Sequence, residues 1–246
     1  MINISKISNS SFFGKFLRFF LNLIPPGMVL PILQGPLKGK KWIKGSGVNS
    51  YWLGTFELYN QQAFIDNIKK NDVVFDLGGQ AGFYTLLASD LVGPSGKVVV
   101  FEPLPFNIYN INKHLKMNHC KNVEVVEAAV MDYEGEAGFY QKGANTSDGQ
   151  ICEDGEIKVK TMTIDGWIKA GKLPIPNFMK IDVEGTEAEV LEGAKETLTK
   201  YHPILVLSGT YDKIKWLSSL GYDLKPTYGT GMPAGDFLCV YKNNRT

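Results

Sequence analysis

The sequence is poor in the residues that hold metals or form disulfides, since its 246 residues include three cysteines and three histidines. The cysteines have neither a metal-ligand spacing nor a disulfide framework, so they favour a reducing compartment and a cytoplasmic location. The histidines follow no ligand pattern, and we expect each to be structural. These residues are Cys120, Cys152, Cys239, His114, His119 and His202.

An apolar run long enough to cross a bilayer is lacking near the start of the chain. Residues 11–24 have a helical apolar pattern, but these fourteen residues include Lys15 and Arg18, and a spanning helix needs roughly 20 apolar residues. No small-residue cleavage site follows, so we expect no secretory signal. The pattern predicts an amphipathic helix, ended by Pro25-Pro26, that covers the protein's own core or a subunit contact. Peripheral membrane binding is the alternative.

Acidic residues are absent from the first 56 positions. Residues 1–56 hold seven of the 26 Lys and Arg residues and none of the 25 acidic ones, so the rest of the chain carries a net charge of −6. We therefore divide the chain into a basic, aromatic N-terminal extension (1–56) and a main domain (57–246). The basic extension indicates an anionic substrate, membrane or protein partner, unless it docks on its own acidic body. The acidic body disfavours nucleic acid as a partner.

A glycine-rich turn joins a strand to a helix in residues 73–85, which read VVFDLGGQAGFYT. Glycines allow close backbone approach to a ligand, and a helix N-terminus offers unpaired N–H groups. A dinucleotide fingerprint needs glycines at relative positions 1, 3 and 6, whereas Gly78 and Gly82 are four apart and enclose Gln80. With Asp76 two positions before the first glycine, the pattern favours S-adenosylmethionine, because a carboxylate suits its amino-acid end. An ordinary strand–turn–helix is the alternative.

A second acidic residue ends the next predicted strand. Residues 97–101 read KVVVF, and Glu102 follows them, twenty positions after Gly82. A carboxylate there can accept hydrogen bonds from both ribose hydroxyls of a nucleoside on the glycine turn. The alternative is a solvated glutamate at a strand end. The spacing from the turn favours the ribose site.

Strand and helix patterns alternate through the main domain. Apolar runs predict five strands, and two further runs predict a terminal antiparallel hairpin. The runs are residues 73–75, 97–101, 122–126, 178–181, 204–207, 224–227 and 237–241. We expect an α/β fold with a Rossmann-like, seven-stranded, mostly parallel sheet, preceded by a helix and a hairpin in the extension. Residues 137–141 and 157–162 predict another hairpin.

Four motifs together resemble the FkbM-type S-adenosylmethionine-dependent methyltransferases. They are DLGGQAGFYT (76–85), FEPLPFN (101–107), AVMDYEG (129–135) and FMKIDVEGTEAEVLEGA (178–194). The similarity covers roughly residues 50–208. It implies a class I methyltransferase fold and methyl transfer to hydroxyl oxygens of sugars, glycoconjugates or other natural products.

The resemblance also assigns the cofactor-binding residues. Asp76, Gly78, Gln80 and Gly82 would hold the methionine end, and Glu102 would bind the ribose. The turn that contains Glu127 and Ala128 would lie near the adenine. One departure lies in the turn, where the family often has an Ala-Asn pair and this chain has Gly79-Gln80.

For catalysis, the resemblance puts Asp182 closest to the methyl group. We expect Asp182, and secondarily Glu184, to act as general base. Glu184 has the alternative role of stabilising a helix N-terminus. The two carboxylates could instead share a divalent cation, although the sequence shows no clear third ligand. The fifth strand ends in residues 207–210 (LSGT), where the family frequently has a glutamate and a histidine. This departure predicts a shifted substrate or a different way of activating the acceptor.

Two other classes of function remain open. A nicotinamide-dependent oxidoreductase uses a similar sheet, but the glycine spacing and the lack of a Tyr-x-x-x-Lys pair disfavour it. A methyltransferase-like scaffold of weakened activity, recruited to a membrane or partner, would explain the basic extension and the altered fifth strand.

Overall fold

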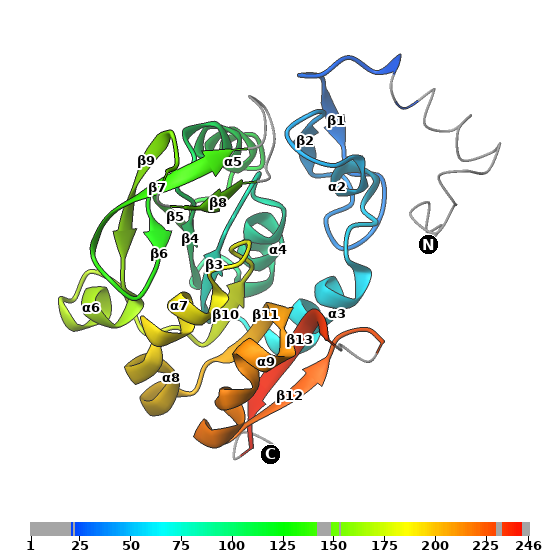
Figure 1. Ribbon diagram of the computed structural model, residues 1–246. Helices are drawn as coiled ribbons and strands as arrows, with labels where there is room; N and C mark the ends of the chain where they lie inside the picture. Colours follow the sequence, from blue (N-terminus) through cyan, green and yellow to red (C-terminus); the bar gives the residue numbers. More distant parts are fainter. Residues whose placement is uncertain (1–20, 22, 142–148, 153, 230–232, 243–246) are drawn as a thin grey trace.

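The structure is a computed structural model and describes residues 21, 23–141, 149–152, 154–229 and 233–242 (Figure 1). The predicted amphipathic helix at residues 11–24 therefore lies almost entirely outside the described residues. Within the described ranges, no helix has both the length and the apolar character needed to cross a membrane.

A central sheet of seven strands forms the body of the described chain, in the order β12-β13-β11-β10-β3-β4-β5. Its first five strands along the chain are parallel, and β13 runs antiparallel to both β11 and β12. The strands are β3 (Val73–Leu77), β4 (Lys97–Phe101), β5 (Val123–Val126), β10 (Phe178–Ile181), β11 (Ile204–Thr210), β12 (Tyr222–Pro226) and β13 (Ala234–Tyr241). The predicted α/β fold with its terminal hairpin is confirmed.

The strand order reverses between β3 and β10, which are neighbours in space although β10 is the fourth of the parallel strands in sequence. In such sheets a ligand site lies beyond the carboxyl ends of the strands at this point. The register pairs Asp76 of β3 with Lys180 of β10, and the amide of Asp182 donates to the carbonyl of Leu77 at 3.1 Å. The pairing therefore brings acidic and basic side chains together at the point of reversal.

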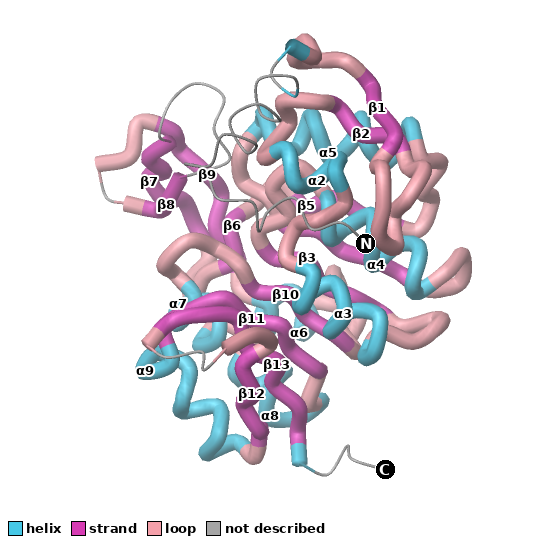
Figure 2. Tube along the Cα trace, turned by 90° about the vertical axis from the view of Figure 1, so that its right-hand side faces the viewer, coloured by secondary structure: helices cyan, strands magenta, loops and turns pink. Residues whose placement is uncertain are grey.

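Helices cover both faces of the sheet (Figures 1 and 2). Both faces need cover because successive side chains of each buried strand point to opposite faces and both sets are apolar. Val74 faces α3, α4 and α5, whereas Phe75 faces the layer of α6 to α9. These elements are α3 (Leu58–Asn67), α4 (Phe83–Val92), α5 (Pro105–Met117), α6 (Ile164–Lys169), α7 (Glu187–Glu192), α8 (Lys195–Tyr201), α9 (Tyr211–Ile214) and the 3₁₀ helix η2 (Lys215–Leu220).

The motif after β10 gives two helices, α7 and α8, although Val190, Leu191, Ala194 and Leu198 have the spacing of one face of a single helix. The break lies at Gly193 and Ala194. A Cβ on Gly193 would lie 2.0 Å from the carbonyl oxygen of Met131, so a glycine is required for the chain to pass this close to the neighbouring turn. The contact joins residues 62 positions apart, so the local sequence pattern does not reveal the break.

A separate four-stranded sheet lies beside the central one, in the order β6-β9-β7-β8 (Figure 2). It comprises β6 (Ala129–Val130), β7 (Gly135–Gln141), β8 (Gly149–Ile151) and β9 (Ile157–Met162). The predicted hairpin of residues 137–141 and 157–162 is confirmed as the antiparallel pair β7 and β9. The strands β6 and β8 are too short for their side-chain periodicity to be read from the sequence.

The described part of the extension packs against α4 and α5. It contains the antiparallel pair β1 (Val29–Pro31) and β2 (Lys41–Ile43), which confirms the predicted hairpin, and the short helix α2 (Asn49–Leu53). Trp42 and Trp52 are buried in the same core cluster as Phe83 of α4. The division of the chain at residue 57 stays a prediction.

Candidate functional site

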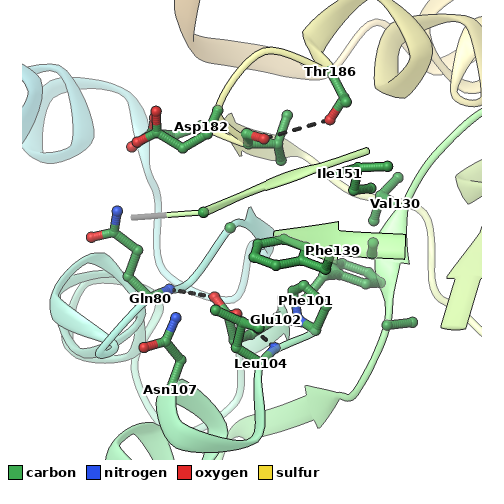
Figure 3. A pocket seen from close by; sticks show the side chains of 17 residues that line it. Gln80, Phe101, Glu102, Leu104, Asn107, Val130, Phe139, Ile151, Asp182 and Thr186 are labelled. Atoms are coloured by element: carbon green, nitrogen blue, oxygen red, sulfur yellow. Dashed lines mark hydrogen bonds between the residues drawn. The ribbon is translucent and has the colours of Figure 1, made fainter. Parts of the chain in front are cut away.

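A pocket of about 540 Å³, its open mouth included, lies beyond the carboxyl ends of β3, β4 and β10 (Figure 3). The glycine turn and the β4 end line one part, Phe139 and Ile151 of the second sheet line another, and Asp182 lies at the far end. The two sheets together therefore enclose the site.

The glycine turn is pressed against both neighbouring strands. Gly78 has φ +79°, and a Cβ there would lie 2.0 Å from the carbonyl oxygen of Asp182. A Cβ on Gly79 would lie 2.2 Å from Cγ2 of Val100. Gly82, at φ +89°, is the N-cap of α4. Only glycine fits these positions, so the backbone itself forms the wall that a ligand would approach.

Glu102 lies at the base of the pocket and is 3% exposed. Its Oε2 accepts from the amide of Gln80 at 2.8 Å, and its Oε1 accepts from the amide of Leu104 at 2.9 Å. Burial raises the pKa of Glu102 to about 7, against the opposing effect of hydrogen bonds from Leu104, Asn107 and Gln80. A carboxylate has about four lone-pair sites, so Glu102 is oriented by its three protein donors and can still accept from a ligand hydroxyl.

Asn107 of α5 is a lining residue that the sequence analysis missed. Its side chain is 2% exposed, and its Oδ1 has no hydrogen-bond partner within the described residues. A buried amide oxygen without a donor costs free energy, which a ligand N–H or O–H would recover. The signal in the sequence was present, since Asn107 ends the FEPLPFN motif.

Asp76 is wholly buried and lies outside the pocket lining. Its Oδ2 accepts from the hydroxyl of Thr85 at 2.6 Å, and its Oδ1 lies 3.9 Å from Nζ of Lys180 without a hydrogen bond from any described residue. Burial raises the pKa of Asp76, and the charge of Lys180 opposes this. Asp76 therefore joins β3 to the first turn of α4 through Thr85.

Lys180 is the second functional residue that the sequence analysis missed. Its Nζ donates to Oδ2 of Asp182 at 3.1 Å and lies 5.2 Å from the centre of the Tyr84 ring. Burial alone would lower the pKa of Lys180, but the nearby carboxylates of Asp182, Asp76 and Glu57 outweigh it and raise the pKa. The only signal was a lysine inside the apolar run FMKI.

The remaining predicted site residues are placed differently. Ala128 lines the pocket, whereas the side chain of Glu127 is exposed outside it. Glu184 is an exposed lining residue at φ +55° that precedes α7, and the carboxylate that accepts from the amide of Gly185 belongs to Glu187. In Figure 3 the carboxylate of Asp182 points away from the ring of Phe139.

The extension contacts the glycine turn through Tyr51, whose hydroxyl donates to Oε1 of Gln80 at 2.6 Å. His114 makes a second link, because its Nδ1 donates to the carbonyl of Ala81 at 2.7 Å while its Nε2 accepts from the amide of Ile43 at 3.0 Å. Residues 27–56 thus contact the glycine turn directly through Tyr51 and indirectly through His114.

Residues 71–224 match the family model described as the methyltransferase FkbM domain. The chain belongs to the FkbM methyltransferase family. The predicted family is thereby confirmed on a match that includes the glycine turn, the β4 end and the β10 end.

Two curated relatives have low identity to this FkbM chain. The hexuronic acid methyltransferase AglP of Haloferax volcanii is 24% identical over 143 residues, which are 58% of each chain. The 2-O-methyltransferase NoeI of Sinorhizobium fredii is 26% identical over 151 residues, which are 54% of this chain and 61% of that one. The chain thus spans about three fifths of these relatives. A methyltransferase FkbM crystal structure from Methylobacillus flagellatus has the same fold, with a TM-score of 0.52 at 16% identity over 80% of this chain and 56% of that one.

The FkbM fold implies S-adenosylmethionine, and the residues present fit it. The backbone wall at Gly78, the unpartnered amide oxygen of Asn107 and the oriented carboxylate of Glu102 line the same pocket. For a divalent cation the described residues offer no cluster of three or more His, Cys, Asp or Glu ligands. Asp182 is bonded there to the ammonium group of Lys180.

Proposed function

We propose that this protein is an S-adenosylmethionine-dependent O-methyltransferase acting on a hydroxyl of a sugar, glycoconjugate or related natural product. The observation that carries the proposal is the oriented carboxylate of Glu102 beside the glycine turn, with Asp182 at the other end of one pocket. The names of the two curated relatives, one acting on a hexuronic acid and one a 2-O-methyltransferase, support a sugar as acceptor.

In this proposal the pocket residues bind and orient. Glu102 and Asn107 accept hydrogen bonds from the nucleoside end, while Leu104 and Phe139 supply apolar walls. The bound S-adenosylmethionine would supply an electrophilic methyl group on sulfur. Asp182 lies where an acceptor would enter, and holding the two reactants in line can supply several kcal/mol of the barrier, on the order of 7 in favourable cases.

The cofactor half of the proposal is tested by calorimetry with S-adenosylmethionine. We expect Glu102→Gln and Asp76→Ala to weaken binding at least tenfold. Asp66→Asn is a matched control, because Asp66 is an exposed carboxylate on α3 whose Oδ1 accepts from Gln62. Equal affinity in all four proteins would exclude Glu102 from the cofactor site and would show that the buried contact between Asp76 and Thr85 does not shape that site.

The acceptor half is tested by transfer of a labelled methyl group into a metabolite extract and into methyl glycosides of a hexose, an N-acetylhexosamine and a hexuronic acid. Mass spectrometry then locates the new methyl group. We expect a methyl ether on one sugar class; label on nitrogen or on nucleic acid would contradict the proposal. A cytoplasmic location and a membrane or subunit contact through residues 11–24 stay predictions.

A further inference from the structure

Glu57 occupies a strained position between α2 and α3. It is the N-cap of α3 with φ +40°, a left-handed conformation that costs a non-glycine residue roughly 1–3 kcal/mol. Within the described residues six non-glycine residues have positive φ, and three of them, Glu57, Gln80 and Glu184, lie around the reversal point of the sheet. Strain that recurs around one site is typical of function.

The carboxylate of Glu57 is held by two donors on one of its oxygens. Oε2 accepts from the hydroxyl of Tyr84 at 2.9 Å and from Nδ2 of Asn60 at 3.1 Å. Asn60 is itself fixed, since it also donates to Asp236 at 2.9 Å and accepts from Thr227 at 2.8 Å. Both hydrogen bonds that the described residues make to this carboxylate fall on Oε2, so the orientation of the group is set while Oε1 is left for a ligand.

The charges around Glu57 connect it to the end of the pocket. Tyr84, which donates to Glu57, has its ring centre 5.2 Å from Nζ of Lys180, and this Nζ donates to Asp182 at 3.1 Å. Asp236 of β13 accepts from Asn60, the other donor to Glu57. Burial is the largest effect and raises the pKa of Glu57, Lys180 lowers it, and the two aspartates raise it further. Tyr84 has a pKa well above its ordinary value, mainly through burial, so its hydroxyl remains a donor.

Asp182 and Glu57 differ in the groups that donate hydrogen bonds to them. Oδ2 of Asp182 accepts a charge-assisted hydrogen bond from Lys180 at 3.1 Å. Glu57 has neutral donors as hydrogen-bond partners, Tyr84 and Asn60, and these orient it without an ion pair.

We propose that Glu57 is the general base of the methyl transfer, with Asp182 positioning the acceptor hydroxyl next to it. This rests on the proposed O-methyltransferase function. The acceptor oxygen forms a bond to the methyl carbon, the carbon–sulfur bond breaks with its electron pair remaining on sulfur, and the hydroxyl proton passes to Oε1 of Glu57. The products are the methyl ether and S-adenosylhomocysteine, and Glu57 then releases the proton to solvent.

The test compares Glu57→Gln with the wild type and with the control Asp66→Asn, which changes an exposed carboxylate on the same helix. The substrates are labelled S-adenosylmethionine and the glycoside or extract fraction that the wild type labels. We expect kcat to fall roughly 10²–10⁴-fold in Glu57→Gln, as for loss of a general base. The affinity for S-adenosylmethionine and the unfolding temperature should remain those of the wild type.

A pH profile separates this role from a structural one. In the wild type kcat should rise with pH as the carboxyl of Glu57 ionises, whereas in Glu57→Gln that rise should vanish and Glu57→Asp should retain it at reduced kcat. If kcat of Glu57→Gln lies within threefold of the wild type, Glu57 is not the general base, and the proposed function still stands. A wild type that binds the cofactor but labels nothing would overturn both.

Discussion

Acid should destabilise this protein through His114, a buried histidine that links the extension to the glycine turn. The side chain is wholly buried and stacks on Trp42 at 3.8 Å between ring centres. Because the amide of Ile43 must donate, Nε2 has to accept, so His114 is neutral with its proton on Nδ1, bonded to the carbonyl of Ala81. Burial lowers the pKa of His114 from 6.5 to about 4.

The direction and size of this pH effect on stability follow from the difference in proton binding between the folded and unfolded states. Between pH 6.5 and 4 the unfolded chain binds a proton at this residue that the folded protein does not, so stability is full above pH 6.5 and falls as pH decreases. A difference of about 2.5 pKa units corresponds to about 3 kcal/mol. Glu102 acts oppositely, because its pKa is raised to about 7 and its protonation in the fold adds stability as pH falls from 7 to 4.5. The wild-type curve alone therefore cannot isolate His114.

The assay is the difference in unfolding free energy between the wild type and His114→Gln, from urea titrations at pH 7.5, 6, 5 and 4. At pH 7.5 the variant should be less stable by about 1–3 kcal/mol, since it loses buried hydrogen bonds. That difference should shrink by about 3 kcal/mol towards pH 4. His119→Gln is the control, because His119 is exposed. Parallel curves for the wild type and His114→Gln would refute the assignment of the neutral imidazole.

Three further substitutions have expected outcomes. Gly78→Ala should lower the unfolding temperature and abolish S-adenosylmethionine binding in calorimetry, since its Cβ would lie 2.0 Å from the carbonyl oxygen of Asp182; normal binding would contradict this. Lys180→Met should cost about 3–5 kcal/mol in urea unfolding, because it leaves Asp76 buried without a counter-charge, and a loss under about 1 kcal/mol would argue against the ion pair. Asn107→Ala should weaken cofactor binding about 5- to 30-fold, the equivalent of one buried hydrogen bond, with little change in kcat at saturation; unchanged affinity would exclude it from the site.

The fold and the centre of the site could be predicted because their signals are local. Glu102 and Asp182 each follow a buried strand directly, and parallel strands bring their carboxyl ends to one edge of the sheet. The glycine spacing and the FkbM motifs lie in continuous segments. Such features need no knowledge of which strands become neighbours.

The missed residues depend on register and on contacts between distant segments. Lys180 faces Asp76 because β10 pairs with β3, which a strand of four residues does not reveal. Tyr51 reaches Gln80 only after the extension folds back. Glu57 gains its partners from α4 and, through Asn60, from β13, and its backbone conformation leaves no trace in the sequence.

The pair of contacts that Tyr51 and His114 make to the glycine turn has a consequence for dissecting the chain. A ligand seated on that turn should slow amide hydrogen exchange at Ile43, thirty-five residues before Gly78, because opening β2 would also release Ala81. Truncations made to remove the basic extension should therefore end before residue 27. A truncation at residue 57 would also remove Tyr51 and so loosen the glycine turn, whose ligand binding it was meant to preserve.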